Sequence, residues 1–159
     1  MNRGSAYGNQ GNYKEAAQEY SKAIKLREAL RNIFEQQGEW PPQMTNDLAK
    51  AYWGRGSALN DQCRYEDAVI EFANAIELME SLRKILEPRS EWPPQMTNDL
   101  ANAYMNRGSA YGNQGNYKEA AQEYSKAIEL GEALRNILEQ QGEWPPQMTN
   151  SLAAAYMNR

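Results

Sequence analysis

Residues 105–128 of the chain have the sequence MNRGSAYGNQGNYKEAAQEYSKAI, and residues 1–24 carry the same letters. A diverged copy starts at Trp53, which gives a period of 52 residues (53 − 1 = 105 − 53 = 52). A fixed period of this size is typical of arrays in which each unit buries its apolar face against its neighbours. We therefore expect one continuous array with repeats at 1–52, 53–104 and 105–156, and 157–159 beginning a fourth copy.

The third copy predicts a long helix that starts at about Asn116. Asn116 stands three residues before Glu119, an arrangement typical of a capping box. Glycine and paired prolines, at Gly142 and 145–146, should end this helix after about Gln140. An apolar stripe with helical spacing runs along it, formed by Ala120, Tyr124, Ala127, Ile128, Leu134, Ile137 and Leu138.

A second helix is expected before this one in each copy. It runs from about Pro42 to Leu59 or from Pro94 to Tyr111, because a proline fits the first turn of a helix. Gly115 and its equivalent Gly11 can take a positive φ at the end of the helix. Cys63 replaces this glycine in the middle copy, where a left-handed backbone costs about 1 kcal/mol, so we expect a looser or differently shaped turn there.

Composition argues against several classes of function. Lys+Arg 17 against Asp+Glu 21 gives a net charge of -4, without the basic excess that binds nucleic acid. No apolar run approaches the roughly 20 residues of a membrane span, and the N-terminus is repeat sequence rather than a signal. Cys63 is the single cysteine, which favours a reducing, cytoplasmic setting. Histidine is absent, and neither a phosphate loop nor an activated nucleophile is recognisable, so we expect no enzyme, no cofactor and no metal.

The repeat resembles the tetratricopeptide repeat family in the order and spacing of its small and aromatic residues. The matching positions are Tyr104, Gly108, Ser109, Ala110, Tyr111, Gly115, Asn116, Tyr117, Ala120, Tyr124 and Ala127. This resemblance implies an all-α, right-handed superhelical solenoid of antiparallel helix hairpins. The family's repeat has about 34 residues, so these helices should be elongated. The chain departs from the family at two positions, with arginine in place of a leucine (Arg3, Arg55, Arg107 and Arg159) and glutamate in place of a late proline (Glu28, Glu80 and Glu132).

The first and third copies are nearly identical, which indicates recent duplication or deliberate design. They differ at Lys25/Glu129, Arg27/Gly131, Phe34/Leu138, Asp47/Ser151 and Lys50/Ala154.

The resemblance also implies a function in binding proteins or peptides. In the family, the first helices line a concave face, and their inward side chains contact the ligand. The matching candidates are Asn2, Ser5, Asn9, Lys50, Trp53, Ser57, Asp61, Asn102, Met105, Asn106, Ser109 and Asn113. The asparagine amides offer both a donor and an acceptor to an extended peptide; the alternative is that they only solvate the groove.

A second interpretation is self-assembly. Residues 1–10 resemble the second half of a first helix, and residues 145–159 resemble the first half of the next. We expect a homo-oligomer in which residues 145–159 of one molecule lie beside residues 25–37 of another, head to tail or as a swapped dimer. The alternative is that both ends fray.

Two further sets of residues recur once in each repeat. The recurrent arginines are predicted to pair with carboxylates or to cover aromatic rings rather than to form a stripe for anions. Trp40, Trp92 and Trp144 stand beside paired prolines and are predicted to plug the hairpin ends rather than to form a patch for a partner.

Overall fold

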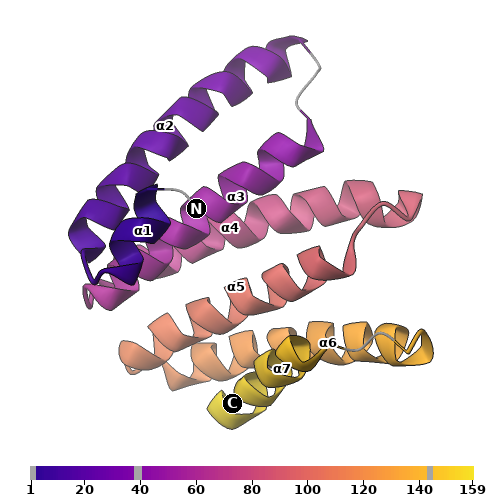
Figure 1. Cartoon of the computed structure of the whole chain (residues 1–159). Coiled ribbons are helices and arrows are strands. Elements are labelled where there is room, and N and C mark those ends of the chain that lie inside the picture. The colour runs from indigo at the N-terminus through magenta and orange to yellow at the C-terminus, as the bar shows by residue number, and fades with distance from the viewer. Residues whose placement is uncertain (1–2, 38–40, 143–144) are drawn as a thin grey trace. The chain divides into compact units, whose positions relative to one another are not determined.

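The computed structural model of the chain describes residues 3–37, 41–142 and 145–159, and all regular secondary structure in these ranges is helical. The elements, drawn in Figure 1, are α1 (Arg3–Asn9), α2 (Tyr13–Gln37), α3 (Pro42–Asp61), α4 (Tyr65–Leu86), the 3-10 helix η1 (Glu87–Arg89), α5 (Pro94–Asn113), α6 (Tyr117–Gln140) and α7 (Pro146–Asn158).

The chain divides into two compact units. Unit 1 is Met1–Leu82 and holds α1, α2, α3 and most of α4. Unit 2 is Arg83–Arg159 and holds α5, α6 and α7. The boundaries of the three repeats, and the right-handed superhelix, stay predictions.

The predicted all-α fold is confirmed, and the helix boundaries follow the sequence signals closely. α6 ends at Gln140, and Gly142 beyond it has a φ of 72°. α3 and α5 each begin at the second of two prolines, with the first proline extended, because proline lacks the N–H that a first turn leaves unpaired.

The turn between the two helices of each hairpin has the same hydrogen bonds in all three copies. In unit 2 the N–H of Gly115 donates to Gly112 at 2.9 Å, and that of Asn116 donates to Tyr111 at 2.9 Å. These two bonds form a Schellman motif, in which the residue after the helix is left-handed. Cys63 takes this conformation with a φ of 59° and makes the same pair of bonds. The expectation of a differently shaped middle turn was therefore wrong, because the hydrogen bonds outweigh the small steric cost.

Two local predictions on α6 were also wrong. Asn116 makes no side-chain capping bond, and its amide N–H donates to the Gln114 side chain at 2.9 Å. Ile137 is exposed, whereas its neighbours Leu134 and Leu138 in the predicted stripe are buried with Met148 of α7. The buried apolar stripe of α6 is therefore narrower than the stripe predicted from the sequence.

The paired helices of a hairpin approach closely where a glycine faces an aromatic ring. A Cβ atom on Gly108 of α5 would lie 2.8 Å from the ring of Tyr124 in α6, and one on Gly56 of α3 would lie 2.9 Å from the ring of Phe72 in α4. No side chain fits at either glycine without displacing the ring. These contacts set the spacing within each hairpin.

We predict that Gly108→Ala destabilises the chain by about 1–2 kcal/mol, because overpacking exceeds the gain in helix propensity. Gly112 lies one turn further along α5 and is the matched control, since a Cβ there has no neighbour closer than 4.0 Å. Gly112→Ala should stabilise the chain by up to about 1 kcal/mol. Urea unfolding followed by circular dichroism measures both, and equal effects would contradict the packing argument.

Candidate functional site

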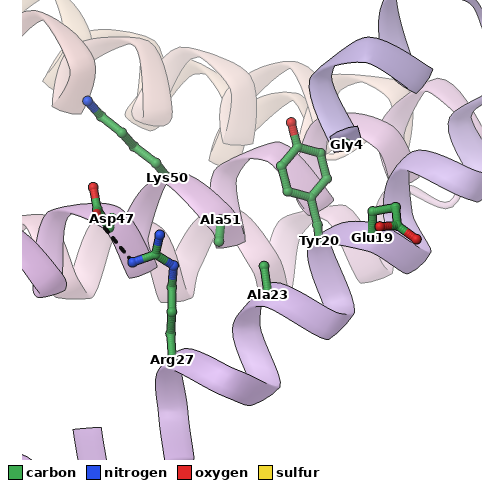
Figure 2. Close-up of a pocket in the computed structure, with 8 residues that line it drawn as sticks. All are labelled: Gly4, Glu19, Tyr20, Ala23, Arg27, Asp47, Lys50 and Ala51. Atoms are coloured by element: carbon green, nitrogen blue, oxygen red, sulfur yellow. Dashed lines mark hydrogen bonds and ion pairs between the residues drawn. The ribbon is translucent and has the colours of Figure 1, made fainter. Parts of the chain in front are cut away.

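A groove opens in unit 1 between α1, α2 and α3 (Figure 2). Its volume is about 380 Å³, and its lining residues are Gly4, Glu19, Tyr20, Ala23, Arg27, Asp47, Lys50 and Ala51. Ala23 and Ala51 are small, so they leave the space between α2 and α3 open.

Charged side chains border one side of this groove. Arg27 of α2 donates to Asp47 of α3 at 3.1 Å, as the dashed line in Figure 2 marks. The other oxygen of Asp47 accepts from the Gln43 amide at 3.0 Å. Lys50 extends from α3 on the same side of the groove (Figure 2). The groove therefore combines an apolar floor with a polar border.

Unit 2 contains the equivalent gap between helices, and side chains fill most of it. The equivalent gap lies between α5, α6 and α7 and has a volume of only about 10 Å³. From α5, the residues that line it are Asn98, Ala101, Asn102 and Met105. The first half of α5 therefore supplies the side chains that fill the gap beside α6.

Two leucines of α2 on either side of the lining residue Arg27 in sequence are exposed. Leu30 is 44% exposed, whereas its equivalent in α6, Leu134, is 3% exposed. Leu26, one turn earlier in α2, is 69% exposed. Two adjacent exposed leucines on one helix form an apolar patch of the kind that marks interaction sites.

Ion pairs join the two helices of the α3–α4 hairpin and of the α5–α6 hairpin. Arg55 of α3 donates to both oxygens of Glu71 in α4, at 2.5 and 2.6 Å. Arg107 of α5 donates to Glu123 of α6 at 2.6 and 2.8 Å. Each guanidinium also lies 5.6 Å from the centre of a tyrosine ring one turn earlier. The predicted pairing of these two arginines is confirmed, so neither contributes to a stripe for anions; the Arg3 side chain lies outside the described residues, and Arg159 is exposed.

We predict that Glu123→Gln lowers the free energy of unfolding by about 3 kcal/mol, because it leaves Arg107 largely buried without its counter-charge. Glu139→Gln is the control, since the Arg135–Glu139 pair at 2.7 Å is 46% exposed on both sides. An exposed pair contributes less than about 1 kcal/mol. Chemical denaturation of both variants tests this, and similar losses would refute the role of burial.

Glutamates at the family's proline position bind the tyrosine of the next helix. Glu28 of α2 accepts from the Tyr52 hydroxyl of α3 at 3.0 Å, and Glu132 of α6 accepts from Tyr156 of α7 at 3.0 Å. Burial and the bond to Glu28 raise the pKa of Tyr52 to about 12. The departure from the family's proline thus creates a link between one hairpin and the next helix.

The Tyr52–Glu28 bond predicts loss of stability at alkaline pH. Tyr52 has a higher pKa in the folded chain than the ordinary value of 10.0, so its contribution is complete below about pH 10 and is lost as the pH rises to about 12. Tyr52→Phe should reduce the fall in unfolding free energy between about pH 10 and about pH 12. Tyr117→Phe, at an exposed tyrosine, should leave this fall unchanged, and equal slopes in both variants would contradict the assignment.

The candidate ligand residues occupy three kinds of position. Ser5 shares a hydrogen bond of 3.0 Å with Tyr20, and Ser109 is hydrogen-bonded to Tyr124, so both hydroxyls face the other helix of their hairpin. Lys50 lines the groove of unit 1, and Asn102 and Met105 line the small gap of unit 2. The remaining described candidates are exposed (Asn9, Trp53, Asp61 and Asn113) or half-buried (Ser57 and Asn106). Asn2 lies outside the described residues.

The sequence predicted residues 25–37 as a place for another helix, and of the residues that line the groove it predicted Lys50 alone. Arg27 and Asp47 stand out in the sequence only because the first and third copies differ there. No sequence pattern distinguishes Ala23 or Ala51 as ligand-binding residues. Their assembly into one groove depends on the packing of α2 against α3.

Trp92 lies at a hairpin end and is half-buried. Its indole N–H donates to the Thr97 hydroxyl of α5 at 2.7 Å, which fixes the ring against the start of that helix. Trp40 and Trp144 lie outside the described residues.

Within the described residues, no three His, Cys, Asp or Glu side chains gather in a way that could hold a metal ion. None of the described helices has a stretch long and apolar enough to cross a membrane.

Family models of the tetratricopeptide repeat match two parts of the chain, residues 1–30 and residues 101–132. These two parts of the chain are tetratricopeptide repeats. Repeats of this family generally mediate interactions between proteins.

Among solved structures, the chain is similar to the crystal structure of MamA, with 17% sequence identity and a TM-score of 0.37. The match covers 99% of this chain and 95% of that one. A search of curated proteins gives no match.

Proposed function

We propose that the chain is a protein-binding scaffold that receives an α-helix of a partner in the groove of unit 1. The observation that carries this proposal is the exposure of Leu26 and Leu30 beside a groove of about 380 Å³. An apolar face of a helix laid into an apolar groove is a common mode of peptide recognition. The Arg27–Asp47 pair and Lys50 give the groove a polar border that orients such a helix.

The chain itself supplies a suitable probe for the groove. Residues 94–108, which include the first half of α5, fill the equivalent gap in unit 2 with Asn98, Ala101, Asn102 and Met105. A synthetic peptide with this sequence therefore presents the side chains that the groove should accept.

We predict that a fluorescently labelled peptide 94–108 binds the chain and that Leu30→Glu weakens binding at least about tenfold, since burial of a leucine side chain contributes about 1.5–3 kcal/mol. Ile137→Glu is the matched control, because Ile137 is an exposed apolar residue of unit 2 and should leave affinity unchanged. Fluorescence anisotropy measures all three proteins. Absence of binding, or equal weakening by both substitutions, would overturn the proposal.

A second candidate surface is the family's ligand face on the first helices. Trp53 of α3 is exposed, and Asp61 of the same helix is exposed two turns later. An aromatic and a carboxylate on one exposed helix can hold an extended peptide by stacking and hydrogen bonding. Selection of displayed peptides against the chain, followed by loss of binding in Trp53→Ser but not in Leu30→Glu, would favour this face over the groove.

A further inference from the structure

We infer that the solvent-exposed face of α4 joins two copies of the chain as an antiparallel, two-fold symmetric pair. This face shares no residue with the groove of the proposed function. It belongs to the middle copy of the repeat, which has another copy before it and another after it in the sequence. Its exposure is therefore a property of the solvent side of the repeat and not of either end of the array.

Six residues of this face are spaced three or four apart, so they lie in one row along the helix. We call this row the α4 stripe; it consists of Glu66, Ile70, Ala73, Glu77, Ser81 and Lys84. The row is continuous because α4 is one uninterrupted helix over Tyr65–Leu86. Ile70 is 57% exposed, Ala73 is half-buried, and the other four residues are exposed.

The charged side chains of the α4 stripe are not used within the chain. Arg64 and Arg83, the nearby arginines of this segment, pair with Asp67 and Glu87, which are outside the stripe. Glu66, Glu77 and Lys84 have no hydrogen-bond or ion-pair partner in residues 3–37, 41–142 and 145–159. Glu77 and Lys84 are two helical turns apart, so they do not pair with each other in one molecule.

A second α4 that runs in the opposite direction is complementary to this stripe. The reversal brings Lys84 of the second copy opposite Glu77, and the two-fold symmetry forms the same pair a second time. Ser81 lies between these two positions, near the two-fold axis, where its small side chain lets the helices approach closely. Charge pairs across a helix–helix contact of this kind set the orientation of the partner.

The same arrangement covers the exposed isoleucine. Ile70 comes to lie beside the second copy's Pro88, an exposed residue of η1 just after α4. Ala73 is small and leaves room for this contact. Burial of Ile70 in both copies supplies the apolar part of the contact.

The equivalent stripes of α2 and α6 lack this complementarity. Each has an uncharged asparagine at the position of Lys84, so no cation is available for the acidic residue of a second copy. Each has a glutamine at the position of Ile70, so the apolar contact is absent as well. The residues concerned are Gln18, Asn32, Gln122 and Asn136. The pairing is therefore specific to α4.

The contact closes at two copies, because both molecules contribute the same surface. Exposed ion pairs are individually weak and are screened by salt. We therefore expect a reversible dimer that forms as the protein concentration rises and dissociates as salt is added.

The experiment reverses the charges of the α4 stripe. Glu77→Lys places lysines opposite lysines, and Lys84→Glu places glutamates opposite glutamates, so each variant alone should dimerise at least about tenfold more weakly. The double variant Glu77→Lys/Lys84→Glu has opposite charges again and should dimerise like the unsubstituted chain. An equimolar mixture of the two single variants should also form a dimer, because the lysines of one meet the glutamates of the other.

Sedimentation velocity across a wide range of concentrations measures these dimers against the monomer mass of 18.1 kDa. Glu129→Lys is the matched control, because Glu129 is the exposed equivalent of Glu77 in α6, and it should leave dimerisation unchanged. Ile70→Gln introduces the residue of the other two copies and should weaken the dimer at least about tenfold. Circular dichroism checks that every variant keeps its helices.

Three results would overturn the inference. The first is an unsubstituted chain that stays at 18.1 kDa at every concentration. The second is a double variant, or a mixture of the single variants, that does not regain the dimer. The third is a Glu129→Lys variant that weakens the dimer as much as Glu77→Lys does.

Discussion

The second helix of each hairpin carries an apolar stripe that needs a neighbour on either side. In unit 2 this requirement is met: α6 packs against α5 on one side and against α7 on the other, and Leu134 is buried between them. In unit 1, α2 packs against α3, but Leu30, the equivalent of Leu134 in the stripe, is exposed, as is the nearby Leu26. Apolar surface left in contact with water raises the free energy of a chain, and this exposed surface is what supports the proposal that unit 1 binds a partner helix.

The ion pairs of the chain differ in how deeply they are buried. Arg107 and Glu123, like Arg55 and Glu71, bind each other across the hairpin, so their charges are used for stability. Arg27 and Asp47 differ in this respect, because their pair is partly exposed at the border of the groove. A partly exposed pair contributes little to stability, but it can orient a partner and select against apolar competitors.

Sequence patterns predicted most of the fold. Helix ends follow from the prolines at the start of α3 and α5 and from the glycines after α5 and α6, because these residues act within a few residues of chain. The 52-residue period repeats these local signals. Predictions that depended on competition between local hydrogen bonds were less successful. The Asn116 side chain hydrogen-bonds Gln114 and does not cap the helix. Cys63 has a left-handed backbone, because two backbone hydrogen bonds compensate for the steric cost.

The sequence by itself determined the helices, their pairing into hairpins and the family, because periodicity, turn residues and small-to-large packing positions are local properties. That residues 25–37 receive another helix stays a prediction. Only the tertiary structure decided which side chains form the groove, because Ala23 and Ala51 come from different helices and meet only when α2 packs on α3. Packing within the hairpins, of α1 on α2 and of α5 on α6, likewise placed Ser5 and Ser109 against tyrosines of the paired helix, because which face of a helix is covered depends on the helices that pack against it.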